Sequence, residues 1–327
     1  HSAVSVRKRI KNIVLKSMVY TSLIFMLACH GHDSVERRGR LITDSAGREV
    51  VIPDTVRSVI PLKSGTLRLL SYLSLTERVS HIEGAERRRQ VPYLFANPQL
   101  RSLPVIGAGN NYDTELLASA ESDLIIATFM TPAEADRLQR LSRKPVVLID
   151  YADLSKGRDR LYETLKLMGS IFAKEERADS LIHYFNAAFA DFDRRSRLAN
   201  YKQQDVYVGG VAYNGAHGIT STESEYPPFE LLSVSHCAQG LSDSNNKNSL
   251  SHESVFIDPE QLIEWNPDII FLDSSGRQIW EEEIETEVIR ESIKAFREDE
   301  VYTLLPYNWN TTNYENLLCN AWFVGSI

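Results

Sequence analysis

The chain has 327 residues, enough for two domains of ordinary size, and its 43% hydrophobic and 24% charged residues predict a packed core. This composition excludes a disordered chain and a protein made mainly of membrane-spanning helices. The formal net charge is −8, but the first 28 residues carry five basic and no acidic side chains, which leaves −13 on the rest. Such an acidic body is a poor binder of nucleic acid.

The N-terminus has the features of a bacterial secretion signal. A basic stretch precedes a ten-residue apolar run over 19–28, which is too short to span a bilayer but typical of a secretory signal. The sequence MLAC over 26–29 resembles a lipobox, in which Cys29 becomes the lipidated N-terminus. We therefore predict a lipoprotein signal peptide over 1–28, a tether over 29–40 and a protein exported to the periplasmic side of the membrane or the cell surface. An uncleaved N-terminal anchor is the alternative.

The body begins with a hairpin and then alternates helices and strands. Residues 41–60 alternate apolar and polar side chains around two turn signals, which predicts a hairpin that leads into a core strand over 57–60. Apolar runs over 123–128 and 145–149 are typical of strands buried on both faces. The other expected elements are helices over 65–75, 113–120 and 133–141 and a short strand over 79–82. This alternation predicts an α/β fold with a largely parallel sheet.

A helical stretch separates this lobe from a second one. Residues 158–197 follow a helical period, and no Pro/Gly/Ser-rich linker interrupts them, which indicates a rigid connector plus the first helix of a second lobe. The second lobe is expected to contain buried strands over 205–211 and 268–273, a surface loop over 242–251 and a last helix over 312–324. We predict an N-terminal lobe over 41–156, a connecting helix over 157–173 and a C-terminal lobe over 174–327.

One short pattern occurs once in each predicted lobe. Glu115 opens a predicted helix eight residues before Asp123, which precedes an apolar strand, and Glu260 stands eight residues before Asp268 in the same way. The repetition supports two lobes of similar build.

Several ordered blocks resemble a known family: TDSAGREVVIP, LPVIGAGNNYDTELLASAESDLIIAT, PVVLIDY and DPEQLIEWNPDIIFLD. From about residue 41 onwards the chain resembles the class III substrate-binding proteins of ABC importers, which carry ferric siderophores, haem or cobalamin. The resemblance implies a monomer with two Rossmann-like α/β lobes, mainly parallel sheets, a long rigid helix between them and a ligand cleft between the lobes. It also implies that the C-terminal lobe lacks a last helical segment, because relatives continue beyond the position of Ile327.

The expected ligand contacts lie in loops after strands, because ligands of open parallel sheets bind beyond the carboxyl ends of the strands. The candidates for ligand binding are Lys63, Asn111, Tyr112, Tyr213, Asn214, His217, Trp309, Asn310 and Asn313. Structural alternatives are open for several of them. His217 is equally suited to satisfy backbone groups of its own turn, Tyr213 to pack in the core, Lys63 to stay solvated, and Thr312 or Asn313 to cap the last helix.

No motif of an enzyme is present: the sequence has no GxSxG elbow, HExxH, paired CxxC or phosphate loop. We therefore expect no catalytic residue and no intrinsic cofactor. The resemblance implies a binding protein that delivers an iron complex, a small-molecule metal chelate, to an ABC transporter permease dimer. The resemblance implies one docking carboxylate on each lobe, Glu115 and Glu260, although both also suit the dipole of a helix start.

Two questions stay open at this level. The alternative function is a haem- or corrinoid-binding lipoprotein that acts in sequestration or as a chelatase, for which His217 with Glu223 is the nearest pair. Apart from Cys29, Cys237 and Cys319 stand in apolar contexts that suit either buried free thiols or a disulfide.

Overall fold

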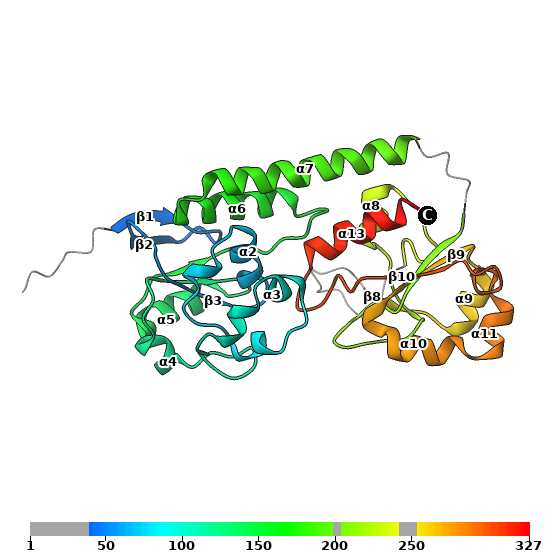
Figure 1. Cartoon of the computed structure of the whole chain (residues 1–327), viewed down its shortest axis with the longest axis horizontal. Coiled ribbons are helices and arrows are strands. Elements are labelled where there is room, and N and C mark those ends of the chain that lie inside the picture. Colours follow the sequence, from blue (N-terminus) through cyan, green and yellow to red (C-terminus); the bar gives the residue numbers. More distant parts are fainter. Residues whose placement is uncertain (1–38, 199–203, 242–253) are drawn as a thin grey trace, which may run out of the picture. The chain divides into compact units, whose positions relative to one another are not determined.

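Two three-stranded parallel sheets form the centres of the two halves of the protein in a computed structural model (Figure 1). The first sheet has the order β3 (Val59–Leu62), β4 (Leu124–Ala127), β5 (Val146–Leu148). The second has the order β10 (Val301–Leu304), β9 (Ile269–Asp273), β6 (Val206–Gly209). In these two sheets, every strand except β10 is buried throughout, as expected of apolar runs covered on both faces. The predicted α/β class with parallel sheets is confirmed.

The structure describes residues 39–198, 204–241 and 254–327. We call residues 41–156 the N-terminal half and the described part of 204–327 the C-terminal half. The predicted signal peptide, Cys29, nearly all of the tether and the loop over 242–251 lie outside the described residues. The first described strand, β1 (Gly39–Thr43), begins in the last two residues of the predicted tether.

The repeated pattern of the sequence corresponds to a repeated hydrogen-bonding arrangement. Asp123 precedes β4, the central strand of the first sheet, and its Oδ2 accepts from the backbone N–H groups of Arg57 at 2.9 Å and Ser58 at 3.1 Å. Asp268 precedes β9, the central strand of the second sheet, and its Oδ2 accepts from the N–H of Asp205 at 2.9 Å. In each half a carboxylate thus joins the beginning of the central strand to that of its neighbour.

Two small antiparallel pairs complete the strands. The predicted hairpin is present as β1 and β2 (Glu49–Pro53), and Asp44 Oδ1 accepts from the N–H groups of Ala46 and Arg48 in its turn. β7 (Ser221–Glu223) pairs with β8 (Ser254–Phe256) in the C-terminal half. This second pair was not predicted, because strands of three residues show no readable alternation.

The helices of the N-terminal half follow the predicted order. They are α2 (Thr66–Tyr72), α3 (Pro92–Ala96), α4 (Thr114–Ser119) and α5 (Pro132–Ser142), with three short 3₁₀ turns, η1 (Thr76–Arg78), η2 (Gly84–Arg87) and η3 (Pro98–Ser102). The strand expected over 79–82 is wrong. Val79 and Ile82 are buried, but they make only isolated bridges to Val59 and Val105, because the 3₁₀ turns on either side leave too few extended residues for a ladder.

Two helices follow the first sheet, as predicted. α6 (Arg158–Phe172) ends at Ala173, whose φ of 53° is left-handed, and α7 (Glu175–Leu198) follows it. α7 packs against α6, and also against α8 (Pro227–Leu232) and α13 (Tyr314–Val324) of the C-terminal half (Figure 1). The segment over 157–173 predicted as the connecting helix is therefore α6, whereas the longer α7 is the helix that reaches elements of both halves.

The remaining helices belong to the C-terminal half. They are α9 (Pro259–Trp265), η4 (Ser274–Gly276), α10 (Arg277–Ile284), α11 (Glu287–Ser292) and α12 (Lys294–Arg297). Cys237 is half-buried and Cys319 is exposed on α13, and both are free thiols, so the expected burial of Cys319 is wrong. Within the described ranges, no helix combines the length and the apolar character that crossing a membrane requires.

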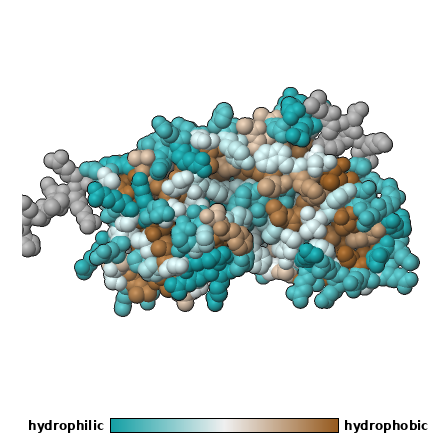
Figure 2. All heavy atoms as spheres, viewed as in Figure 1, coloured by the Kyte–Doolittle hydropathy of each residue, from teal (hydrophilic) through white to brown (hydrophobic). Residues whose placement is uncertain are grey.

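One hydrophobic core extends through both halves. Leu69 of α2, Leu165 of α6, Phe192 of α7, Phe229 of α8 and Tyr314 of α13 belong to the same cluster of buried side chains. On the face seen in Figure 2, hydrophilic residues cover most of the outer edges, and hydrophobic residues show between the elements of both halves. Burial along α6 and α7 follows the helical period that the sequence predicts.

Candidate ligand-binding site

A cavity of about 430 Å³ is lined by residues from both halves. The N-terminal half contributes Ala85, Arg88, Arg89, Gln90 and Asn110, and the C-terminal half contributes Ser275, Pro306, Trp309 and Asn310. Ser275 follows β9, and the segment from Pro306 to Asn310 follows β10, so the C-terminal wall lies beyond the carboxyl ends of its strands as predicted. Among the described residues that line the cavity, none is acidic.

Arg89 is fixed in the N-terminal wall by two neighbours. Its nearly buried guanidinium forms an ion pair with Glu86 and donates to Asn110 Oδ1 at 2.7 Å. Glu86 in turn accepts the hydroxyl of Tyr93 at 2.6 Å through its other oxygen. Arg88, by contrast, is exposed. The wall thus combines one guanidinium of fixed orientation with one that is free to turn towards a ligand.

Trp309 and Asn310 make up much of the opposite wall. The Trp309 side chain is 38% exposed, so part of its flat indole face is accessible. Asn310 has a φ of 52°, in the left-handed region that asparagine tolerates better than most residues. Both were predicted from their place after a strand, and the structure brings them to the cavity; contact with a ligand stays a prediction.

Four of the predicted ligand-binding residues do not line the cavity. Three belong to the N-terminal half, and the fourth, Asn313, belongs to the loop before α13. Lys63 Nζ lies 5.5 Å from the centre of the Tyr112 ring, so these two side chains are neighbours, but neither lines the cavity. Asn111 is exposed, and its neighbour Asn110 lines the cavity instead. Asn313 is 1% exposed and its carboxamide is bound inside the protein, to Arg68 and to the carbonyl groups of its own loop.

The candidates after β6 form a separate aromatic cluster around Phe256. The ring of His217 lies 4.9 Å from that of Phe256, and the ring of Tyr213 lies 6.5 Å from it. His217 Nε2 lies 2.5 Å from the carbonyl oxygen of Tyr213, so this histidine satisfies a backbone group of its turn. Asn214 occupies the same turn with a φ of 51°. None of the three is among the residues that line the cavity.

Sequence reasoning missed three residues that line the cavity, Arg88, Arg89 and Asn110. The two arginines do not follow a strand directly, so the rule of loops after strands did not select them. Arg88 and Arg89 belong to a run of three arginines over 87–89, which was the available signal. That run does not tell which guanidinium is buried. The assignment depends on Glu86, and on the backbone hydrogen bonds from Gly84 to Gly107 and from Ala85 to Gly109, which bring the loop of Asn110 against η2.

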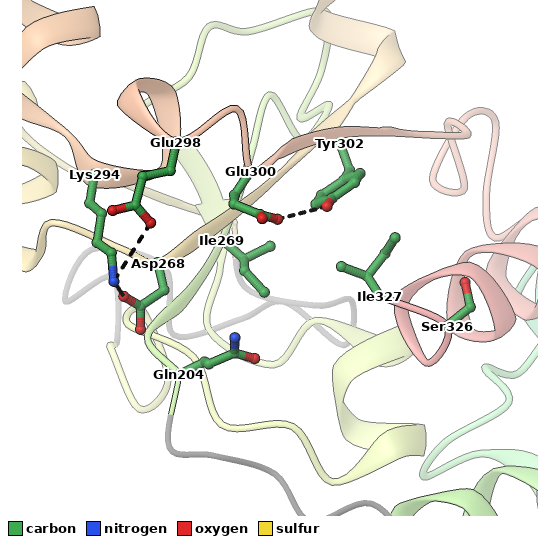
Figure 3. A pocket seen from close by; sticks show the side chains of 9 residues that line it. All are labelled: Gln204, Asp268, Ile269, Lys294, Glu298, Glu300, Tyr302, Ser326 and Ile327. Atoms are coloured by element: carbon green, nitrogen blue, oxygen red, sulfur yellow. Dashed lines mark hydrogen bonds and ion pairs between the residues drawn. The ribbon is translucent and has the colours of Figure 1, made fainter.

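A second cavity, of about 530 Å³, lies at the opposite end of the second sheet (Figure 3). Asp268 and Glu300 line it just before β9 and β10 begin. Lys294 Nζ donates to Asp268 Oδ1 at 2.7 Å and lies 3.9 Å from Glu298, and Glu300 accepts the hydroxyl of Tyr302. These polar groups satisfy one another, so the cavity with the arginines is the better candidate.

The comparison with known proteins decides the family. Residues 64–307 match the family model described as periplasmic binding protein. The chain belongs to the periplasmic binding protein family. The resemblance seen in the sequence blocks is thereby confirmed. Proteins of this family bind small molecules, work with the permeases of ABC transporters, and are solute-binding proteins rather than enzymes.

Relatives of this periplasmic binding protein share its fold at low sequence identity. The molybdate-binding protein MolA of Haemophilus influenzae is 22% identical over 254 residues, which cover 71% of this chain and 68% of the relative. A solved solute-binding protein from Veillonella parvula is 19% identical with a TM-score of 0.68, over 88% of this chain and 86% of that one. The siderophore-binding protein BauB, solved with acinetobactin and ferric iron, is 18% identical with a TM-score of 0.62, over 88% and 98%.

Outside the cavity, the two predicted docking carboxylates of this binding protein occupy equivalent places. Glu115 lies in the first turn of α4 and Glu260 in the first turn of α9, and both side chains are exposed. Each helix leads into the central strand of its sheet, β4 or β9. The geometry therefore matches the repeat in the sequence, whereas docking itself stays a proposal.

The C-terminal wall of the site is supported by two buried carboxyl groups. Asp273 Oδ1 accepts from the N–H of Ser275 at 2.8 Å and from its hydroxyl at 2.6 Å, and burial raises the pKa of Asp273 to about 6. Glu223 accepts the hydroxyl of Tyr307, and burial raises the pKa of Glu223 to about 8. Glu223 and His217 thus have different partners, and neither lines the cavity. The pair that a chelatase would need is not assembled.

Replacement of Glu223 by Gln should reduce the pH dependence of stability. Because the pKa of Glu223 is raised to about 8, the folded protein keeps a proton that the unfolded chain releases near its ordinary pKa. The free energy of unfolding should therefore fall as pH rises from 5 to 8, with a contribution from this group on the order of 3 kcal/mol. Gln keeps an acceptor for Tyr307 and removes the titration. Urea unfolding at pH 5, 6, 7 and 8 measures the change.

The matched control is Glu285→Gln, which removes a carboxylate from an exposed position of the same half. It should keep the pH dependence of the unmodified protein. Some dependence should also remain in Glu223→Gln, because burial likewise raises the pKa of Asp273 to about 6 and of Glu83 to about 7. Equal pH dependence in Glu223→Gln and Glu285→Gln would contradict the assignment.

Proposed function

We propose that this periplasmic binding protein captures an iron complex, a ferric siderophore or a similar chelate, and delivers it to an ABC transporter permease. The observation that carries the proposal is the chemistry of the cavity: two arginines, two asparagines and an accessible tryptophan, with no acidic residue among its described lining. Guanidinium groups bind carboxylate and other anionic oxygens, and an indole face packs against a flat organic ligand. An anionic metal chelate with organic arms presents both kinds of surface.

The size of the cavity and one neighbour support this choice. A volume of about 430 Å³ lies within the range of about 300–1,000 Å³ usual for small-molecule sites. BauB, which has the same fold, was solved with an iron complex of an organic siderophore. Of the ligand-binding residues predicted from the sequence, the proposal keeps Trp309 and Asn310 and adds Arg88, Arg89 and Asn110.

A second candidate ligand is a free oxyanion. MolA, the relative at 22% identity, is a molybdate-binding protein, and arginines with carboxamides also suit a small tetrahedral anion. The accessible Trp309 face has no role towards such an ion, which favours the organic chelate. The earlier alternative, sequestration of haem or a corrinoid or chelatase action, depended on His217 with Glu223 and has lost that support.

Removal of the indole or of the exposed guanidinium should weaken binding of the iron complex. We expect Trp309→Ala and Arg88→Gln each to lower the affinity for a ferric catecholate siderophore about tenfold or more, equivalent to about 1.4 kcal/mol. Isothermal titration calorimetry measures the affinity. Arg140→Gln, which removes an exposed arginine from α5, is the matched control and should bind normally.

Titration with molybdate in the same experiment separates the two candidate ligands. Binding of molybdate with no binding of any ferric siderophore would replace the chelate by an oxyanion. Unchanged siderophore affinity in both Trp309→Ala and Arg88→Gln would move the ligand out of this cavity.

We propose that Glu115 and Glu260 pair with basic residues of the two permease subunits. Exposed carboxylates at equivalent places on the two halves suit a partner built of two subunits. The double variant Glu115→Gln/Glu260→Gln should reduce uptake of the labelled ligand severely and leave its affinity unchanged. The control Glu121→Gln/Glu264→Gln makes the same charge change near the same two helices. If the carboxylates only stabilise their helix starts, both double variants will take up ligand normally.

We also propose that Cys29 carries a lipid anchor, as the lipobox-like sequence over 26–29 suggests. Cys29→Ala should move the protein from the membrane fraction to the soluble fraction of its host, because the apolar run over 19–28 is too short to span the bilayer. Immunoblots of the two fractions measure this. An uncleaved Cys29→Ala protein that stays in the membrane fraction would identify the segment as an anchor instead.

A further inference from the structure

A buried arginine of the N-terminal half is bound to the loop that forms the opposite wall of the cavity. Arg68 of α2 is 1% exposed, and its Nη1 donates to Tyr151 Oη at 2.5 Å and to the carbonyl oxygen of Thr312 at 2.8 Å. Its Nη2 donates to Asn313 Oδ1 at 2.6 Å. These acceptors are uncharged, although a guanidinium keeps its positive charge when it is buried. Loss of an acceptor would leave part of a buried positive charge without a hydrogen bond, which is strongly destabilising.

Asn313 also holds the loop over residues 307–313, to which it belongs. Asn313 Nδ2 donates to the carbonyl oxygens of Tyr307 and Trp309, both at 3.0 Å, and the backbone N–H of Asn313 donates to Tyr307 at 2.6 Å. Because Arg68 occupies the oxygen of the carboxamide, the NH₂ group must face these carbonyl groups. The guanidinium thus sets the orientation on which the loop's internal hydrogen bonds depend.

The backbone of this loop is strained. Asn310 and Thr311 have φ values of 52° and 71°, and the left-handed region is unfavourable for a β-branched residue such as threonine. Such conformations persist only where surrounding contacts impose them. Here the contacts come from Asn313 on the inside and from the bridge between Asn308 and Thr312.

The strained loop carries Trp309 and Asn310, which face the cavity across from Arg88 and Arg89. We propose that Arg68 is a positioning residue that, through Asn313, holds Trp309 and Asn310 in place and so sets the separation of the two walls. Its consequence for affinity rests on the proposed function, whereas its effect on Trp309 does not. A lysine would not replace it, because one ammonium group lacks the planar fork that reaches Tyr151, Thr312 and Asn313 together.

Fluorine NMR of protein labelled with fluorotryptophan tests the link without any ligand. The chain has four tryptophans, and loss of one signal in Trp309→Phe assigns the resonance of Trp309. In Arg68→Met we expect that resonance to shift or broaden. The resonances of Trp265 and Trp280, which belong to the core of the C-terminal half, should not move.

The matched control is Arg78→Met. Arg78 Nη1 donates to the carbonyl oxygens of Val56 and Phe172, both at 3.0 Å, and contacts the Phe172 ring, so it too is a packed arginine bound to backbone groups. None of its partners belongs to the loop of Trp309. Arg78→Met should lower the melting temperature and leave all four fluorine resonances in place.

Two further measurements complete the test. Asn313→Ala removes the carboxamide from the other side of the link, and it should move the Trp309 resonance even if Arg68→Met does not fold. The second measurement is the affinity for a ferric catecholate siderophore. Arg68→Lys should lower this affinity about tenfold, whereas the Arg78→Met variant should bind the siderophore normally. An unmoved Trp309 resonance in a folded Arg68 variant would overturn the proposal, and so would an unmoved resonance in Asn313→Ala. Failure of the unmodified protein to bind siderophore would instead overturn the proposed function and leave the NMR result standing.

Discussion

The beginning of α13 is bound to the N-terminal half, next to the loop that carries one wall of the cavity. The rings of Tyr151 and Tyr314 stack at 5.1 Å with nearly parallel planes, the hydroxyl of Tyr314 donates to the carbonyl of Ala152, and that of Tyr151 donates to Thr312. Arg68 lies among these groups, and its guanidinium donates to Tyr151, Thr312 and Asn313. Stacking, hydrogen bonds and charge are therefore concentrated at one buried contact. The wall that carries Trp309 depends on it.

The two walls differ in how their polar groups are supported. In the N-terminal wall the charge of Arg89 is partly balanced by Glu86, which leaves the exposed Arg88 as the cation that is free to respond to a ligand. In the C-terminal wall the supporting groups are carboxyls whose pKa values burial raises, Asp273 below Ser275 and Glu223 against Tyr307. The supporting carboxyls face inward and the arginines face the cavity. The described lining of the cavity thus carries positive side chains and no acidic one, although the chain as a whole is acidic.

The parts of the fold that were predictable are those with strong local patterns. The apolar runs that became β4, β5, β6 and β9 are buried on both faces, and the long helical period became α6 and α7. β7 and β8 have three residues each, which is too short for a period to appear. Val79 and Ile82 have the composition of a strand, but tertiary contacts bury them without a ladder. In these places packing overrides the local pattern.

The family was recognisable from sequence blocks that resemble known binding proteins. The α/β class and the loops after strands in which Trp309 and Asn310 stand could be predicted from order and periodicity along the chain, which the sequence contains directly. Three further features became known from tertiary contacts alone: Asn110 rather than Asn111 lines the cavity, His217 bonds to its own turn, and Asn313 is held by Arg68. Such roles depend on partners far away in the chain, 245 positions apart for Arg68 and Asn313. A residue's type and its neighbours in sequence do not specify which distant group its side chain will meet.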